Sequence, residues 1–123
     1  ADSSENLDVA LQLAQTAKAG LPDAAEVADT LGWVYYKKEL PTQAIPYLRE
    51  GVDKDPHRPA YLYHLGMAQV KVGDIIGGRR SLEQALKLDP TNARARELLA
   101  EKEAAPPPRC SAMISLPYRS TDR

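Results

Sequence analysis

Hydrophobic residues recur every three or four positions along six stretches of the chain, and polar residues fill the positions between them. In the first stretch, one side of a helix would carry Leu7, Ala10, Leu11, Ala14 and Ala17. The same spacing predicts amphipathic helices over residues 7–19, 24–38, 42–54, 59–72, 75–88 and 93–104. We expect Asn6 to cap the first helix and Gly20 to end it.

The pattern repeats at a constant interval along the chain. Prolines mark this interval at Pro22, Pro56 and Pro90. Three leucines keep the same spacing, each followed by a small residue, at Leu31-Gly32, Leu65-Gly66 and Leu99-Ala100. A repeat of two helices with a period in the range of about 20–50 residues is typical of a solenoid. One such unit cannot bury its apolar side alone, and stacked units form an extended scaffold, so the pattern favours binding over catalysis.

Composition narrows the classes of function. The 123 residues carry a net charge of −1, without the basic surplus that nucleic acid or an anionic membrane would attract. The single cysteine, Cys110, excludes an internal disulfide and a cysteine-based zinc cluster. No apolar stretch approaches the roughly 20 residues of a membrane span, and the N-terminus lacks the pattern of a signal peptide. We therefore expect a soluble chain, cytoplasmic or periplasmic and envelope-associated as part of a larger protein, with the compartment left open.

The sequence contains no phosphate loop, dinucleotide fingerprint, HExxH pair or nucleophile elbow. His57 and His64 are seven residues apart, but His57 belongs to an Asp-Pro-His-Arg-Pro turn and has no convincing partner ligand. We therefore expect no catalytic residue, no cofactor and no metal site.

The residues at the repeated positions resemble the tetratricopeptide repeat, a family whose unit is two antiparallel helices. In residues 25–58 the family signature is matched by Leu31-Gly32, Tyr35, Ala44 and Pro56. In residues 59–92 it is matched by Leu65-Gly66, Ala85 and Pro90. The resemblance covers roughly residues 7–104. The run LGWVYYKK, followed by AIPYLREGV, resembles bacterial members of the family. The resemblance to the family implies an all-α solenoid of antiparallel helix pairs wound into a right-handed superhelix.

The resemblance divides the chain into five parts. They are the second helix of a truncated N-terminal repeat over residues 1–24, one repeat over 25–58, a second over 59–92, a capping helix over 93–105, and an extended or disordered tail over 106–123. The first helix lacks its usual partner, which leaves Leu7 and Leu11 without cover. We therefore expect self-association through residues 7–19, which could occur by exchange of helices.

Several small residues bear on how closely the helices approach. Gly32 and Gly66 would let neighbouring helices come close together. Glu39 stands where Gly73 of the next unit keeps the glycine usual at the turn, so a left-handed conformation at Glu39 would be strained. Gly78 replaces the usual alanine and is expected to loosen its helix by about 1 kcal/mol.

In this family the first helix of each pair lines the concave face, where exposed side chains choose the partner. Helical projection places on that face Glu26, Asp29, Thr30, Trp33, Tyr36, Lys37, Tyr63, His64, Met67, Lys71 and Arg94. This surface is more aromatic and apolar than a solvated helix requires, which favours an interaction site. Tyr36 and Tyr63 could equally serve packing between helices, whereas Trp33 replaces a small polar residue and favours contact with a partner or a neighbouring subunit.

These residues indicate a non-catalytic scaffold that binds a protein, as a peptide or helix laid along the concave face. The alternative is a structural module, which would mediate self-assembly or act as a spacer within a larger protein.

The best-known ligand of the family is a C-terminal carboxylate of heat-shock chaperones, held in a clamp of lysine, asparagine and arginine. The resemblance puts the clamp's first lysine at Asp29, its asparagines at Trp33 and His64, and its later basic residues at Arg94 and Leu98. Only Arg94 is compatible, and an acidic Asp29 would repel a carboxylate. The resemblance therefore does not extend to that ligand.

Overall fold

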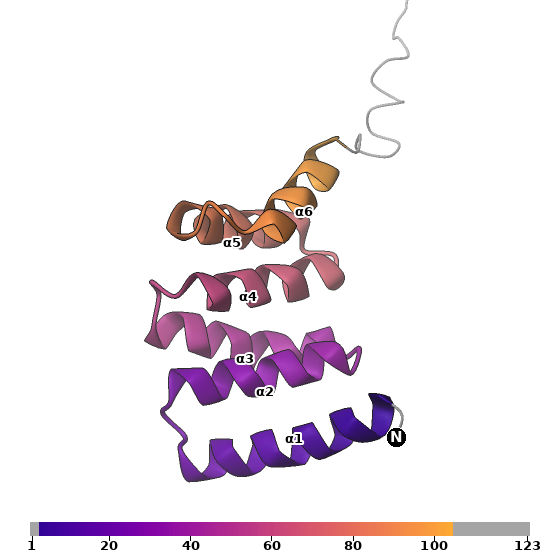
Figure 1. The fold of residues 1–123 in the computed structure, drawn as a ribbon, viewed down its shortest axis with the longest axis vertical. Helices are drawn as coiled ribbons and strands as arrows, with labels where there is room; N and C mark the ends of the chain where they lie inside the picture. Colours follow the sequence, from indigo (N-terminus) through magenta and orange to yellow (C-terminus); the bar gives the residue numbers. More distant parts are fainter. Residues whose placement is uncertain (1–2, 105–123) are drawn as a thin grey trace, which may run out of the picture.

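The computed structural model describes residues 3–104, which form six α-helices. They are α1 (Ser3–Gly20), α2 (Ala25–Lys37), α3 (Pro41–Lys54), α4 (Pro59–Lys71), α5 (Ile75–Leu88) and α6 (Ala93–Ala104) (Figure 1). The helices from α2 to α6 begin and end within one residue of the predicted bounds. In contrast, α1 begins at Ser3, so the prediction that Asn6 caps it is wrong: residues 3–6 hold no proline or glycine, and the helix continues through them. The predicted tail over residues 106–123, with Cys110, lies outside the described residues.

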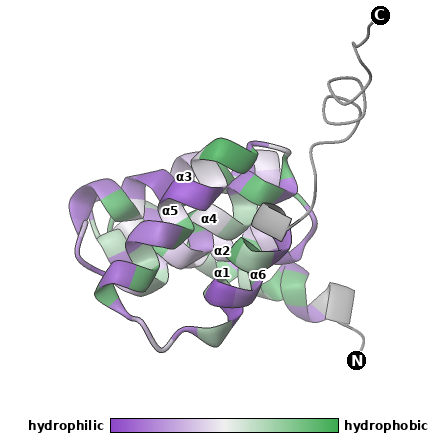
Figure 2. Cartoon of the chain, turned by 90° about the horizontal axis from the view of Figure 1, so that it is seen from above, coloured by the Kyte–Doolittle hydropathy of each residue, from purple (hydrophilic) through white to green (hydrophobic). Residues whose placement is uncertain are grey.

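Consecutive helices run antiparallel and pack on one another along the stack (Figure 1). Beyond these sequential contacts, α2 also touches α4. Seen from above, α3 and α5 lie on one side of the stack and α2 and α6 on the other (Figure 2). The prediction of an all-α fold of antiparallel helix pairs is therefore confirmed. Among residues 3–104, none of the helices has both the length and the apolar composition that crossing a membrane requires.

The core follows the period of the sequence. Leu31, Leu48 and Leu82 are fully buried. Leu48 packs with Ala44, Leu65 and Ala68 between α3 and α4, and the equivalent Leu82 packs with Ala95, Leu98 and Leu99 between α5 and α6. Leu48 and Leu82 therefore each join their own helix pair to the next helix of the stack.

Glycines set the spacing of the two helices within each pair. A Cβ at Gly32 would lie 2.7 Å from Cγ of Leu48 and 3.0 Å from the carbonyl oxygen of Ala44. A Cβ at Gly66 would lie 2.8 Å from Cγ of Leu82. The expectation that Gly32 and Gly66 permit a close approach is confirmed, because any side chain there would meet the buried leucine of the partner helix.

The turn between α2 and α3 and the turn between α4 and α5 share one backbone geometry. Glu39 has φ of 65° and Gly73 has φ of 95°. The next residue in each turn donates its N–H to a carbonyl in the preceding helix, from Leu40 to Tyr35 at 2.9 Å and from Asp74 to Gln69 at 2.9 Å. The predicted left-handed strain at Glu39 is confirmed, since this conformation costs a residue with a side chain roughly 1–2 kcal/mol.

Gly78 has a packing role that helix propensity does not reveal. A Cβ at this position would lie 2.5 Å from Cγ2 of Val70 and 3.0 Å from the backbone nitrogen of Val70. Although alanine is the better helix former by about 1 kcal/mol, the clash includes backbone that cannot turn aside, and overpacking typically costs about 1–3 kcal/mol.

We therefore expect Gly78→Ala to lower the free energy of unfolding by about 1 kcal/mol, measured by urea denaturation. Gly20→Ala is the matched control, because a Cβ at Gly20 meets no atom within 4 Å and alanine should be neutral or slightly stabilising there. A gain in stability from Gly78→Ala would show that the two helices do not approach as closely as described.

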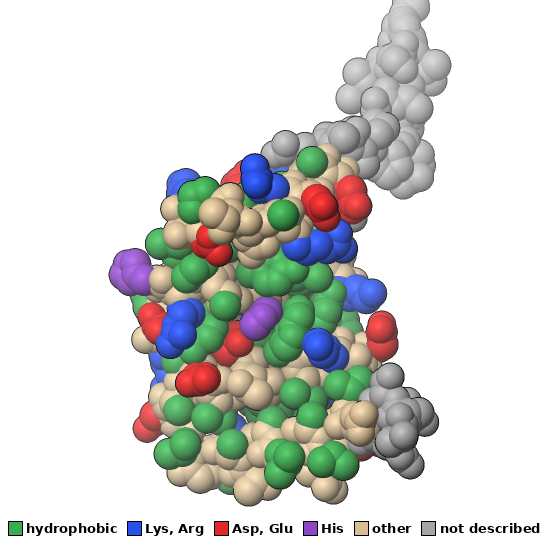
Figure 3. All heavy atoms as spheres, viewed as in Figure 1, with side chains coloured by type: hydrophobic (Ala, Val, Ile, Leu, Met, Phe, Trp, Pro, Cys, Tyr) green, Lys and Arg blue, Asp and Glu red, His purple; other side chains and the backbone are tan. Residues whose placement is uncertain are grey.

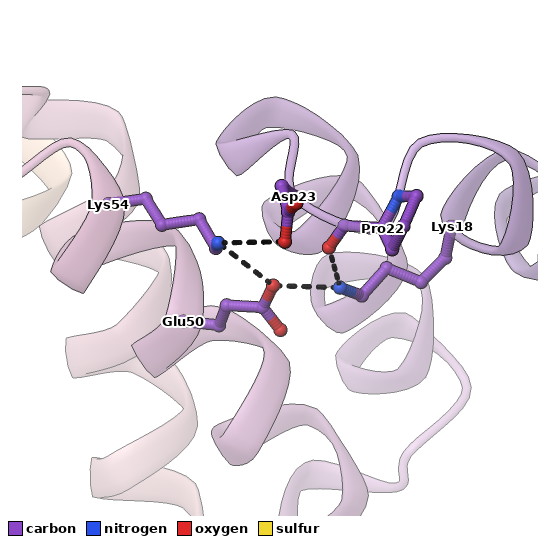
Figure 4. Close-up of polar contacts among 5 residues, drawn as sticks. All are labelled: Lys18, Pro22, Asp23, Glu50 and Lys54. Carbon is purple, nitrogen blue, oxygen red and sulfur yellow. Dashed lines mark hydrogen bonds and ion pairs between the residues drawn. The ribbon is translucent and has the colours of Figure 1, made fainter.

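Polar contacts hold α1 against the rest of the stack. Nζ of Lys18 lies 2.7 Å from Oε2 of Glu50 on α3 and donates to the carbonyl oxygen of Pro22 at 2.6 Å (Figure 4). Lys54 lies 3.6 Å from Asp23 and 4.0 Å from the same Glu50 oxygen (Figure 4). This network joins the end of α1, the loop that follows it and α3, so α1 has a fixed place in the fold.

Candidate functional site

Aromatic side chains from α2 and α4 stack against one another across the boundary between the helix pairs α2–α3 and α4–α5. The Trp33 ring lies 4.7 Å from the Tyr36 ring with 4° between their planes, and 4.0 Å from the His64 ring with 21° between their planes. The Tyr63 ring lies 5.9 Å from that of His64. We call the surface formed by Trp33, Tyr36, Tyr63, His64 and Met67 the aromatic face. Hydrophobic side chains gather over α2 and α4 in the space-filling view (Figure 3).

His64 is held by a buried carboxylate. Its Nδ1 lies 2.8 Å from Oδ2 and 3.1 Å from Oδ1 of Asp29, so the Nδ1–H donates to the carboxylate. The Asp29 side chain is 8% exposed and that of His64 is 19% exposed. Because Nδ1 faces Asp29, Nε2 points away from the carboxylate. The contact fixes the orientation of an imidazole ring that also stacks on Trp33.

The burial of Asp29 corrects the expectation that it is exposed on the binding surface. The residue is 6% exposed, because α4 covers it with His64 and α3 comes close at Gly51. A Cβ at Gly51 would lie 3.3 Å from Cβ of Asp29. Projection of α2 alone could not include these neighbours. The Asp29 carboxylate therefore faces His64 and is almost completely shielded from solvent.

The other predicted residues divide into two groups. The exposed ones are Glu26, Thr30, Lys37, Lys71 and Arg94, and the half-buried ones are Trp33, Tyr36, Tyr63, His64 and Met67. Tyr36 packs against the Leu48 cluster, while Tyr63 and Met67 pack against the Leu82 cluster, so the packing role considered for both tyrosines is present. Burial raises the pKa of Tyr63, and the nearby positive charge of Arg94 partly opposes that rise.

Two exposed ion pairs border this surface, Lys71 with Glu39 at 3.9 Å and Arg94 with Glu97 at 3.4 Å. Exposed pairs of this kind contribute little to stability.

Tyr61 is 4% exposed, although the helical pattern of the sequence did not predict its burial. Its hydroxyl is buried and has no hydrogen-bond partner within residues 3–104, and the guanidinium carbon of Arg58 lies 5.1 Å from the centre of its ring. The helical projection of α4 predicted only one row of buried residues. Since α4 is covered by helices on more than one side, it buries Tyr61 and Gln69 beside its leucines.

Tyr61 should make the free energy of unfolding fall with rising pH in the alkaline range. Burial raises the pKa of its hydroxyl above the ordinary value of 10.0. The folded state therefore keeps Tyr61 neutral to higher pH than the unfolded state does. The contribution of Tyr61 to the free energy of unfolding is fully present below about pH 10 and is lost as the pH rises beyond that value.

We expect Tyr61→Phe to leave the free energy of unfolding at pH 7 unchanged or to raise it by up to about 1 kcal/mol, because a buried hydroxyl without a partner is removed. Above about pH 10, urea denaturation should show a smaller loss of stability in this variant than in the wild type. An identical decline in both proteins would contradict this account of Tyr61.

Two surface hollows lie away from the aromatic face. One of about 320 Å³ is bordered by Val52, Pro56, His57, Leu62, Gln84, Lys87 and Leu88. The other, of about 610 Å³, is bordered by Ile45, Pro46, Arg49, Glu50, Asp53 and Lys54. None of these residues was predicted to bind a partner. Over the part of the chain that the structure describes, no three His, Cys, Asp or Glu side chains come together in a group that could hold a metal ion.

Comparisons with known proteins agree with this arrangement. A model of the tetratricopeptide repeat family matches residues 30–74 and residues 63–104. A search of curated protein sequences gives no match.

Among solved structures, a crystal structure of MamA is similar with a TM-score of 0.73 and 24% identity, covering 80% of this chain and 57% of that one. A second MamA structure has a TM-score of 0.70 and 26% identity over 76% of this chain and 55% of that one. The first tetratricopeptide repeat domain of Spaghetti (RPAP3), bound to the HSP90 peptide SRMEEVD, has a TM-score of 0.75 and 14% identity, covering 92% of this chain and 83% of that one. This chain thus spans just over half the length of the MamA chains.

Proposed function

Because this chain belongs to the tetratricopeptide repeat family, whose units generally act as non-catalytic modules for protein–protein interaction, we propose that its aromatic face binds a peptide or helix of a partner protein. The observation that carries the proposal is the stack of Trp33 between α2 and α4, with Tyr36 and His64 against its ring. Half-buried aromatic side chains that packing already orders are effective anchors for a partner.

The surroundings of the stack also suit a partner protein. Glu26, Thr30 and Lys37 are exposed along α2 beside Trp33 and give the aromatic centre a polar border. Protein interfaces commonly have an aromatic centre with a polar rim. The rim carries both a negative and a positive charge. It therefore favours a partner segment that contains both acidic and basic residues over one that is uniformly acidic or basic.

We infer that residues 25–58 and 59–92 are the two complete units. Equivalent contacts support this division: Tyr47 stacks on Tyr35 at 5.7 Å in one unit, and Ser81 donates to Gln69 at 2.6 Å in the other. By the same spacing, α1 takes the place of the second helix of a preceding unit, and α6 that of the first helix of a following unit.

We infer that the shared fold does not extend to the ligand of the RPAP3 domain. That domain binds a peptide with three acidic residues in SRMEEVD. In this chain, the first helix of the first proposed unit holds the buried carboxylate of Asp29, already paired with His64, and the exposed carboxylate of Glu26. We infer that the partner of this chain presents apolar or aromatic side chains to Trp33 instead of an acidic terminus.

Replacement of Trp33 tests the proposal once a partner captured by the immobilised chain has been identified and purified. We expect Trp33→Ala to weaken the affinity at least about tenfold, and Trp33→Phe to weaken it less, because phenylalanine retains a stacking ring. Calorimetry measures the affinity, and a melting curve measures the stability of each variant.

The matched control is Tyr47→Ala, which removes another aromatic ring, stacked on Tyr35 and outside the aromatic face. This variant should lose stability and keep its affinity. Unchanged affinity in Trp33→Ala, with a lowered melting temperature, would show that the indole serves only the fold.

A second candidate function is that of a structural module that associates through α1. It is favoured by the exposure of apolar side chains on this helix, with Val9 at 56% and Leu13 at 66%. A module of this kind, or a spacer, would tolerate replacement of the aromatic face, whereas the first proposal requires those side chains.

A further inference from the structure

The His64 side chain presents a hydrogen-bond acceptor at the aromatic face. Its Nδ1 lies 2.8 Å from Oδ2 of Asp29, and because an ionised carboxylate only accepts hydrogen bonds, Nδ1 carries the proton of the neutral ring. Nε2 then keeps its lone pair. Within residues 3–104, the buried side-chain atoms without a hydrogen-bond partner are the Tyr61 hydroxyl and Nε of Arg79. Nε2 of His64 has no partner there either and is not among these buried atoms, so it is accessible to solvent.

This acceptor is held in place by packing. The His64 ring stacks on Trp33 with 4.0 Å between the ring centres, and Trp33 in turn stacks on Tyr36. The Asp29 carboxylate that orients the ring is 8% exposed, and burial of a carboxylate costs free energy. Since apolar residues of similar volume are often at least as stable as a buried pair of this kind, stability alone does not account for the pair. An acceptor that is already ordered lowers the entropic cost of binding a donor.

Two carboxylates make the surface around His64 negative. Glu26 is exposed one helical turn before Asp29 on α2, and within residues 3–104 it takes part in no ion pair. The charge of Asp29 is not neutralised when the His64 ring is neutral. Burial raises the pKa of Tyr61, and the nearby charge of Arg58 opposes that rise. The charges of Asp29 and Glu26 add to it, so both carboxylates act on the same region.

The positive charges of this region already have partners. Nε of Arg58 lies 3.3 Å from Oδ2 of Asp55. Nη1 of Arg94 lies 3.4 Å from Oε1 of Glu97. The lysines that border the aromatic face stand at the C-terminal ends of α2 and α4, at Lys37 and Lys71. The surface around His64 therefore keeps a net negative charge, which suits a positively charged group of a partner.

We propose that the partner segment bound at the aromatic face places an arginine side chain against His64, where its guanidinium donates a hydrogen bond to Nε2 and lies near the carboxylate of Glu26. The proposal rests on the proposed function above and names the chemistry of the partner. A guanidinium is positively charged, has only donors and is planar, so it suits an acceptor in a negative surface and stacks on aromatic rings. A lysine has the charge without the planar group, and a carboxylate has neither the charge nor a donor.

Selection of random peptides of about 12 residues, displayed on phage, tests the proposal with the full chain and needs no known partner. Peptides that bind the wild type and not Trp33→Ala are kept, because their binding depends on the aromatic face. We expect arginine in these peptides at no less than about three times its frequency in the library.

A selected peptide is then synthesised with arginine and with citrulline, which has the same shape and keeps N–H donors but carries no charge. By calorimetry, the wild type should bind the citrulline peptide at least about fivefold more weakly. Glu26→Gln should weaken the arginine peptide about two- to fivefold at low salt. Glu83→Gln is the matched control, since it removes an exposed carboxylate from α5, and it should leave the affinity unchanged.

His64→Asn removes the acceptor and spares the buried carboxylate. The asparagine amide nitrogen can take the place of Nδ1 as donor to Asp29, and no atom replaces Nε2. In this variant the preference for arginine over citrulline should fall to at most about half that of the wild type. Circular dichroism shows whether the variant is folded. If it is not, the two peptides and the exposed Glu26 and Glu83 variants decide the question without it.

Trp33-dependent peptides without enriched arginine would overturn this inference and leave the proposed function standing. Equal affinity of the citrulline peptide would also overturn it, by showing that a neutral donor is sufficient. Equal effects of Glu26→Gln and Glu83→Gln would overturn it as well, because net charge alone would then attract the peptide, as would an unchanged preference in folded His64→Asn. If no selected peptide depends on Trp33, the proposed function fails, and this inference fails with it.

Discussion

Replacement of Leu48 with alanine is expected to lower the free energy of unfolding by about 2–5 kcal/mol. Leu48 is fully buried and packs against Gly32 within its unit and against Leu65 in the next unit. Its truncation removes apolar contacts on both sides and leaves a cavity in a stack only six helices long over the described residues. Urea denaturation monitored by circular dichroism measures the loss.

Two controls identify the contact. Leu88→Ala removes the same atoms from a side chain that is 43% exposed, and should cost less than about 1 kcal/mol. Gly32→Ala should destabilise the wild type, because its Cβ would meet Leu48, and should cost less in the Leu48→Ala background, where that side chain is gone. A similar loss from Leu48→Ala and Leu88→Ala would contradict the described core.

Removal of the hydrogen bond between His64 and Asp29 is also expected to lower the free energy of unfolding strongly. His64→Phe keeps a ring against Trp33 but removes the N–H whose hydrogen bond the buried carboxylate of Asp29 accepts. An almost fully buried charge without its partner should cost about 2–4 kcal/mol of unfolding free energy, measured at pH 7.

A double-mutant cycle isolates this interaction. Asp29→Leu combined with His64→Phe removes both partners, and the double variant should be more stable than the sum of the two single losses predicts, by about 1–3 kcal/mol. Additive losses, within about 0.5 kcal/mol, would mean that the two side chains do not interact in solution.

The fold was largely predictable because its contacts repeat. Leu48 and Leu82 are one period apart and fill equivalent places between helices, and Gly32 and Gly66 sit opposite them. The regular recurrence of residue types therefore specified both the helices and the contacts within each pair. The strained turn at Glu39 followed from the comparison with Gly73.

The candidate site was harder to predict because it lies between units. The projection of α2 placed Trp33 and Tyr36 on one side correctly, but it could not show that His64, from the next unit, stacks on Trp33 and covers Asp29. Nor could it show that Tyr61 is buried, since helices on several sides cover α4. A periodic pattern describes one helix, whereas these burials depend on neighbours distant in sequence.

The inter-unit contacts have a consequence for binding. Both the stack of Trp33 on His64 and the hydrogen bond from His64 to Asp29 join α2 to α4. A partner that rests on the aromatic face would contact both units at once and would be sensitive to their relative orientation. Variants that loosen this boundary, such as His64→Phe, should therefore weaken binding as well as stability.

Site-specific photo-crosslinking tests the central claim, that the aromatic face binds a partner protein, most directly. A photoreactive amino acid replaces Thr30, which is exposed on α2 beside Trp33, and in a second protein it replaces Glu83, which is exposed on α5. In cells of the source organism, the account predicts a discrete crosslinked protein from position 30 that disappears in the Trp33→Ala background, and none from position 83. Crosslinks from position 83 alone, or from neither position, would contradict it.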